Sequence, residues 1–300
     1  MMQYSRAQRD DFTSWATPGW TADDLLPLMK RLETYHGPGS LDVHGTDGPI
    51  HISTSSYGAP RPRDQFISVL EELGWPEVKD LSSLDTCNGV QKSLRYTSPD
   101  GKRQDTASRY LLPRVDDGKH PNLHVAVSSQ VVRVLFDGKK ASGVVFRSKQ
   151  QDGTTAADRT IKARKLVVIS AGAFGTPAIL ERSGIGNPDV LKRAGIPEVV
   201  ADVPGVGAEY EDHNLLMYAY HSSLEPEETI DALMRGILKP EDAIASNHGI
   251  LGWNAQEATA KIRPTEEDVA TFDPDLKKLW DDEYKNNPNK PLMIITFVCG

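Results

Sequence analysis

The stretch Lys165–Gly186, KLVVISAGAFGTPAILERSGIG, limits the fold of this chain more than any other. It opens with the apolar, β-branched run Leu166–Ile169, which predicts a strand buried on both faces. The small residues Ser170–Gly172 follow, and they allow a ligand to approach the backbone closely. Thr176-Pro177 then predicts a helix capped by the threonine, with the proline in its first turn. Such an α/β unit either presents its turn to a ligand or only joins two packed elements.

The composition is that of an ordinary globular protein of one or two domains: 300 residues, 38% hydrophobic and 25% charged. A net charge of −8 and scattered basic residues disfavour nucleic acid and anionic membranes as partners. No apolar run approaches the ~20 residues of a membrane helix, and none resembles a secretory signal. Cys87 and Cys299 lie far apart, which excludes a disulfide framework and predicts buried free thiols. We therefore expect an intracellular protein.

Local signals predict several further elements. Thr21–Asp24 and Thr265–Asp268 are each typical of the capped start of a helix. Val131–Phe136 and Ala141–Arg147 predict the two strands of a hairpin. Leu292–Val298 predicts another strand, late in the chain.

Four motifs resemble one known family. The segment Gly172–Gly186, GAFGTPAILERSGIG, matches position by position the second signature of the glucose–methanol–choline (GMC) flavin oxidoreductases. Downstream, Asp202–Gly207 (DVPGVG) and the Asp212-His213 pair resemble another segment of this family at the expected separation. Upstream, His44–Ile50 (HGTDGPI) looks like its glycine- and proline-containing turn. Because these motifs follow the family's order over most of the chain, the chain resembles a GMC oxidoreductase.

The resemblance implies an α/β FAD-binding domain of the GMC type, present in part, and an interrupted α+β substrate domain built on an antiparallel sheet. Residues 1–48 and 105–214 are expected to form the FAD-binding part, and residues 49–104 and 215–300 the substrate part. The sequence contains no GxGxxG phosphate-binding motif. The family's proton-abstracting histidine and its partner lie near the family's C-terminus, beyond Gly300, so no catalytic residue is assigned. We expect a fragment with weak or no affinity for FAD by itself.

The resemblance also implies which residues hold the cofactor. The position that matches Val131 contacts the adenine of FAD through its backbone, a role that any strand residue can fill. The positions expected in the sheet and turn beneath the cofactor are Ser170, Ala171, Gly172 and Thr176. The Asp212-His213 pair is not the family's base, so a structural histidine is expected there. Trp15 and Trp20 could stack on a flavin, but two aromatics beside an amphipathic helix predict core positions.

The implied activity is FAD-dependent oxidation of the CH–OH group of a small alcohol. Hydride passes to flavin N5, and dioxygen then takes the electrons and becomes hydrogen peroxide. Trp15–Tyr35 and Lys261–Thr265 look most like the fungal alcohol oxidase branch. Aryl-alcohol, glucose and choline oxidation stay open as alternatives, as does an inert truncated remnant. No metal is expected, and the family implies a homo-oligomer in the cytoplasm or the peroxisome.

Overall fold

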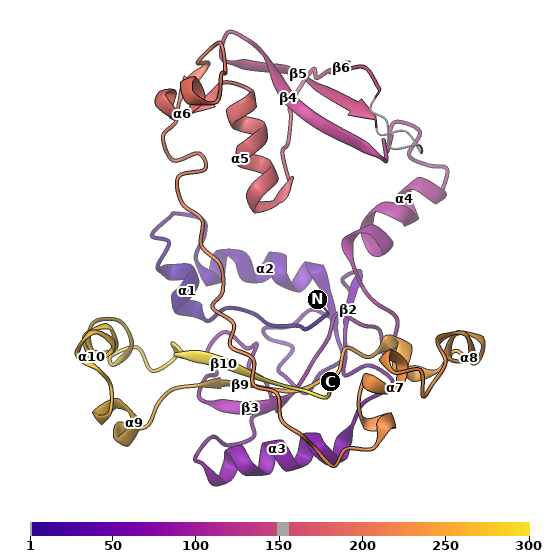
Figure 1. Cartoon of the computed structure of the whole chain (residues 1–300), viewed down its shortest axis with the longest axis vertical. Helices are drawn as coiled ribbons and strands as arrows, with labels where there is room; N and C mark the ends of the chain where they lie inside the picture. The colour runs from indigo at the N-terminus through magenta and orange to yellow at the C-terminus, as the bar shows by residue number, and fades with distance from the viewer. Residues whose placement is uncertain (1, 149–155) are drawn as a thin grey trace. The chain divides into compact units, whose positions relative to one another are not determined.

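The computed structural model describes residues 2–148 and 156–300, which form two compact units (Figure 1). The first unit contains the residues up to 120 and those from 221 onward, and the second contains residues 121–220. The chain therefore leaves the first unit once and returns to it. The boundaries predicted at residues 48, 104 and 214 separate FAD-binding segments from substrate-domain segments, and they stay a prediction. No helix in the described residues is long and apolar enough to cross a bilayer.

A three-stranded antiparallel sheet and one helix form the largest layer of the first unit. Its strands are β3 (Gly89–Lys92), β9 (Gln256–Ile262) and β10 (Met293–Val298), and its helix is α3 (Pro60–Glu72). The strand β9 lies between the other two. On one face of β9, Ala258 and Ala260 are fully buried, and they pack with Ile67 and Leu70 of α3. The predictions of an antiparallel sheet and of a strand over Leu292–Val298 are confirmed.

The other face of β9 is equally buried, although polar side chains point from it. Glu257, Thr259 and Lys261 are each no more than 5% exposed. A strand buried on both faces normally carries apolar residues throughout, because buried charges need partners. The partners of these side chains come from the N-terminal segment of the first unit and from the residues on both sides of β3, as described below.

The N-terminal part of the first unit adds two helices and a short parallel pair of strands. They are α1 (Arg9–Thr13), α2 (Ala22–Leu32), β1 (Glu33–Tyr35) and β2 (Ile50–Ile52). The predicted cap of α2 is confirmed, since the Thr21 hydroxyl accepts from the Asp24 N–H and the Asp24 carboxylate accepts from the Thr21 N–H. A small core here contains Tyr4, Tyr35, Ile50, Ile52 and Leu94.

Short helices complete the first unit. They are η1 (Ala107–Leu111), α4 (Leu112–Asp116), η2 (Pro226–Glu228), α7 (Asp231–Met234), α8 (Pro240–Ala245), η3 (Gly249–Gly252), α9 (Glu266–Ala270), α10 (Pro274–Leu279) and η4 (Trp280–Tyr284). The predicted cap of α9 is confirmed by the reciprocal hydrogen bonds between Thr265 and Asp268. Both cysteines are free thiols, but only Cys299 is fully buried, while Cys87 is half-buried.

The second unit is a three-stranded antiparallel sheet with a helix packed against it. Its elements are β4 (Ser129–Asp137), β5 (Lys140–Ser148), β6 (Arg159–Lys162), α5 (Gly172–Arg182), β7 (Ile185–Gly186), α6 (Pro188–Arg193) and β8 (Ala201–Asp202). The β4–β5 hairpin is the predicted one. The C-terminal end of α5 is joined to β4, because the Ser183 hydroxyl accepts from the Val134 N–H at 2.8 Å and Arg182 Nε donates to the Val132 carbonyl at 2.7 Å.

Two predictions about apolar residues are wrong. Leu166–Ile169 is not a buried strand: it has no strand assignment, and Leu166 and Val168 are about three-quarters exposed. A buried parallel strand needs a hydrogen-bonded neighbour strand on each edge. Among the described residues no strand pairs with this run. Trp15 and Trp20 are not core residues either, since both are about half exposed, 54% and 50%, and they pack on each other.

Candidate functional site

The turn before α5 has a backbone that favours glycine. Gly172 opens the helix with φ of +80°, in the left-handed region that residues with a Cβ atom rarely adopt. A Cβ atom built on Gly172 would meet no other atom within 4 Å. The glycine is therefore required by the shape of the turn, and the space in front of it is open.

The N-terminus of α5 lacks a capping side chain. Its cap residue, Ala171, has no side chain that can accept a hydrogen bond, and the first turn contains no acidic residue. Free N–H groups at the start of a helix carry partial positive charge and bind anions such as phosphates. The turn therefore has the chemistry of an oxyanion site.

Thr176 is not the helix cap that the sequence predicts, and its place beside the cofactor stays a prediction. The helix begins five residues earlier than predicted, at Gly172, so Thr176 and Pro177 lie inside α5 and the threonine does not cap it. Instead, the Thr176 hydroxyl accepts a hydrogen bond from the Ala171 N–H at 3.0 Å. This bond fixes the turn Ser170–Gly172 against the second turn of α5.

Val131 lies at the opposite end of α5 from this turn. It is a half-buried residue of β4, paired with Phe146 of β5. The carbonyl of its neighbour Val132 binds Arg182 in the last turn of α5. The eleven residues of α5 span about 16 Å at 1.5 Å per residue. The predicted cofactor residues thus form two groups, and a ligand that contacts both must be elongated.

The PGVG segment packs against α5 in the same unit. A Cβ atom at Gly207 would lie 3.2 Å from the Glu181 carboxylate and 3.5 Å from Pro177, so the loop contacts the helix closely. Phe174 and Tyr210, both exposed, stack with ring centroids 4.8 Å apart. This aromatic pair was not predicted, although Phe174 lies within the signature. His213 is exposed, and its side chain makes no hydrogen bond in the described residues, so the prediction of a structural histidine is wrong.

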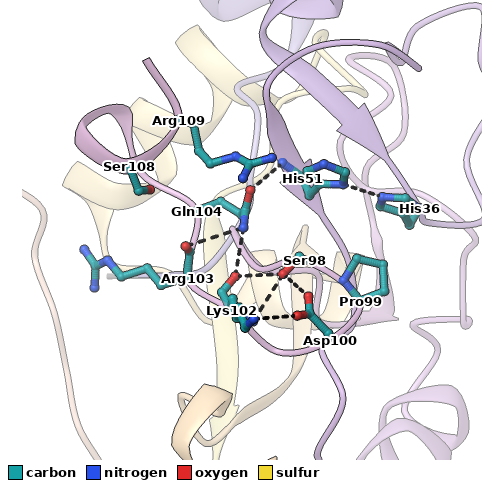
Figure 2. Close-up of a pocket in the computed structure, with 10 residues that line it drawn as sticks. All are labelled: His36, His51, Ser98, Pro99, Asp100, Lys102, Arg103, Gln104, Ser108 and Arg109. Carbon is teal, nitrogen blue, oxygen red and sulfur yellow. Dashed lines mark hydrogen bonds and ion pairs between the residues drawn. The ribbon is translucent and has the colours of Figure 1, made fainter. Parts of the chain in front are cut away.

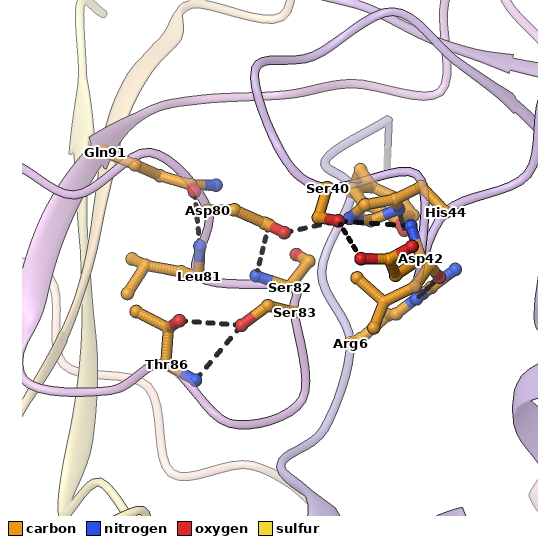
Figure 3. A network of polar contacts seen from close by, with 12 residues as sticks. Arg6, Ser40, Asp42, His44, Asp80, Leu81, Ser82, Ser83, Thr86 and Gln91 are labelled. Atoms are coloured by element: carbon orange, nitrogen blue, oxygen red, sulfur yellow. Dashed lines mark hydrogen bonds and ion pairs between the residues drawn. The ribbon is translucent and has the colours of Figure 1, made fainter. Parts of the chain in front are cut away.

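A buried ionic centre lies in the N-terminal part of the first unit (Figure 3). His44 is completely buried and binds two carboxylates, Glu33 at 2.7 Å through Nδ1 and Asp80 at 2.9 Å through Nε2. Arg6 Nη2 donates to Glu33 at 2.7 Å, and the Tyr4 hydroxyl donates to the same carboxylate at 2.8 Å. Burial lowers the pKa of His44, but the hydrogen bonds to Asp80 and Glu33 outweigh it and raise the pKa above the ordinary value.

This ionic centre joins parts of the chain that are far apart in sequence. It connects the N-terminal segment, β1 and the loop that contains Asp80. Because its central imidazole has no exposed surface, a substrate cannot reach it. We therefore assign it a structural role.

A surface pocket of about 580 Å³ is a further polar feature of the first unit (Figure 2). It lies beside His36, which follows β1, and His51 of β2, whose rings are parallel within 8° and joined at 2.8 Å from Nε2 of His36 to Nδ1 of His51. The opposite wall is the turn from Ser98 to Gln104, followed by Arg109 of η1. The sequence motifs gave no indication of this pocket. In residues 2–148 and 156–300, no three histidine, cysteine or acidic side chains are grouped to hold a metal ion.

Comparison with known proteins identifies the relatives of the chain. The sequence model of the family described as "GMC oxidoreductase" matches residues 1–215. The alcohol oxidase of Candida boidinii is 36% identical over 306 residues, an alignment that covers the whole of this chain and 45% of that protein. The oxygen-dependent choline dehydrogenase of Burkholderia multivorans is 35% identical over 237 residues, covering 77% of this chain and 39% of that protein.

A solved structure supports the same fold. Formate oxidase from Aspergillus oryzae superimposes with a TM-score of 0.77 over 99% of this chain and 52% of that chain. Its sequence identity is 19%, so the likeness concerns the fold alone. The chain spans less than half the length of the alcohol oxidase that it matches.

Proposed function

The chain belongs to the GMC oxidoreductase family, and from that premise we propose that it forms part of an FAD-dependent enzyme that oxidises the CH–OH group of small alcohols. The observation that carries the proposal is the left-handed Gly172 turn before the uncapped helix α5, which lies inside the family's signature. The alcohol oxidase of Candida boidinii, 36% identical to this chain, supports the choice of substrate class.

The residues of the second unit fit an extended dinucleotide. The first N–H groups of α5 suit an anionic oxygen, and Gly172 leaves the space in front of them open. The two groups of predicted residues lie at opposite ends of a helix about 16 Å long, as a ligand with an adenine at one end requires. We assign Val131 to the adenine, and Ser170, Ala171 and Gly172 to the rest of the cofactor. Thr176 acts indirectly, through its hydrogen bond to the Ala171 N–H.

When bound, FAD would accept the hydride from the alcohol carbon and pass the electrons to dioxygen, with hydrogen peroxide as product. The residues described here bind and orient, and none of them is assigned to proton abstraction from the alcohol. Alcohol and dioxygen are the proposed partners. A homo-oligomer and a location in the cytoplasm or the peroxisome are further proposals that rest on the resemblance.

A choline-type substrate is the second candidate, because the Burkholderia choline dehydrogenase is 35% identical over 77% of this chain. The two candidates differ in one measurement, the loss of flavin absorbance under anaerobic conditions after an alcohol is added to the protein in a solution that contains excess FAD. We expect methanol or ethanol to bleach the flavin faster than choline does, and oxygen to restore the colour with formation of peroxide. Faster bleaching by choline would favour the second candidate, and no bleaching by any alcohol would favour the inert remnant.

A further inference from the structure

The pocket of Figure 2 has the charge composition of an anion site. Lys102, Arg103 and Arg109 line it, against one carboxylate, that of Asp100. Asp100 lies 3.4 Å from Lys102, and Asp105 lies 3.5 Å from Arg103, so each of these pairs is close to neutral. The remaining positive charge at the pocket is that of Arg109. Burial, together with the positive charges of Arg109 and His36, lowers the pKa of His51, which agrees with an electropositive environment at that ring.

Arg109 is held in place for such a ligand. Its Nε donates to the Pro49 carbonyl at 2.8 Å, and its guanidinium makes no other hydrogen bond within the described residues. One edge of the guanidinium is therefore fixed by the chain, while the terminal amino groups stay available. A preorganised guanidinium binds carboxylate and phosphate oxygens at a low cost in side-chain entropy.

The histidine pair adds a neutral donor. In the 2.8 Å contact between His36 Nε2 and His51 Nδ1, one nitrogen must donate and the other accept. When His36 Nε2 carries the proton, His51 accepts at Nδ1 and its Nε2–H remains as a donor. An oxyanion in the pocket favours this tautomer. In the other tautomer His51 Nε2 carries a lone pair, which repels an anion and cannot donate a hydrogen bond to it.

We propose that this pocket binds a small organic anion that carries a carboxylate or phosphate group, with Arg109 as its main charged contact and His51 as a hydrogen-bond donor. Its volume of about 580 Å³ is within the range of small-molecule sites. All its residues belong to the first unit, whereas the predicted cofactor residues belong to the second. The proposal is therefore independent of FAD binding.

The test is amide NMR of the isotope-labelled chain, titrated with inorganic phosphate, with acetate, and with chloride at equal ionic strength. We expect saturable shifts at residues 98–109 and at His51 with phosphate or acetate, and the tighter of the two identifies the ligand group. Arg109→Gln is expected to weaken binding about ten- to a hundredfold, the loss of one charge-assisted hydrogen-bonded contact. The matched control is Arg114→Gln, which removes the same charge from α4, outside the pocket, and should leave binding unchanged.

Lys102→Gln provides a second variant, because its side chain is 76% exposed and its loss cannot unfold the unit. We expect it to weaken binding about threefold, as the loss of one screened surface charge does. Three results would each overturn the proposal. The first is that chloride causes the same shifts as phosphate and acetate. The others are shifts located away from residues 98–109, and the same affinity in Arg109→Gln as in Arg114→Gln.

Discussion

Replacing Arg95 with methionine is expected to lower the free energy of unfolding of the first unit by about 3–5 kcal/mol, the cost of leaving a buried charge without its partner. Arg95 is 3% exposed, and its Nη2 donates to the equally buried Glu257 at 2.7 Å. It also donates to Asn254 at 2.8 Å, to the Thr54 carbonyl at 2.5 Å and to the Gln256 carbonyl. One guanidinium thus connects the segments after β2, after β3 and at the start of β9.

Tryptophan fluorescence during urea unfolding measures this effect selectively. All five tryptophans of the sequence lie in the first unit, so their signal reports on that unit alone. The control is Arg235→Met, whose side chain is 72% exposed and 4.0 Å from Asp231. We expect it to change the free energy of unfolding by less than about 1 kcal/mol. If Arg95→Met costs no more than this control, the assignment of Arg95 as the connection between these segments is wrong.

The second large effect is expected from Lys261→Met. Lys261 is 3% exposed on the polar face of β9, and its Nζ donates to the Arg6 carbonyl, the Gln8 side chain and the Leu81 carbonyl at 2.6–2.7 Å. Methionine fills a similar volume but leaves three buried acceptors without a donor. At about 1–3 kcal/mol for each unsatisfied group, and with partial relaxation, we expect a loss of about 3 kcal/mol at pH 7.

The pH dependence of the Lys261 effect has a definite sign. Burial lowers the pKa of Lys261 to about 8, from 10.5 for an ordinary lysine. Between pH 8 and 10.5 the unfolded chain therefore binds more protons at this position than the folded one, and stability rises with pH. The free energy of unfolding of the wild type, relative to the variant, should increase across this window. Lys278→Met, at a side chain that is 76% exposed, is the control, and a flat difference between wild type and Lys261→Met would contradict the lowered pKa.

Local signals in the sequence were sufficient to predict the elements that form from residues close together in the chain. The caps at Thr21 and Thr265 and the hairpin of β4 and β5 each form from residues a few positions apart, and they were predicted correctly. The apolar run Leu166–Ile169 was predicted as a buried strand, but burial depends on neighbouring strands that a periodicity pattern does not contain. The helix α5 began earlier than predicted because Gly172, with its positive φ, starts the helix without a capping side chain.

The buried polar elements could not be predicted from local patterns. The strand β9, QEATAKI, alternates alanine or isoleucine with polar residues and so resembles a strand with one face in water. Its polar face is buried because Arg95, the Arg6 carbonyl and Gln8, all distant in sequence, provide partners. The anion pocket was missed for the same reason, since His36, His51 and Arg109 converge only through the tertiary fold.

The most direct test of the proposed function is the binding of FAD to the turn before α5. Amide NMR of the isotope-labelled chain detects weak binding, which is the strength that we expect for this chain. FAD should shift the amides of Ser170, Ala171 and Gly172 at one end of α5 and that of Val131 at the other. Gly172→Val should abolish the shifts in the turn, because valine is strongly disfavoured at a φ of +80°.

The matched control for that measurement is Gly195→Val. Gly195 lies in the second unit after α6, with a φ of +72° and equally open space around it, so it carries the same backbone strain outside the proposed site. We expect Gly195→Val to keep the FAD-dependent shifts of the wild type and Gly172→Val to lose them. Equal shifts in Gly172→Val and the wild type, or FAD-dependent shifts only outside residues 131 and 170–176, would contradict the assignment of this turn to the cofactor.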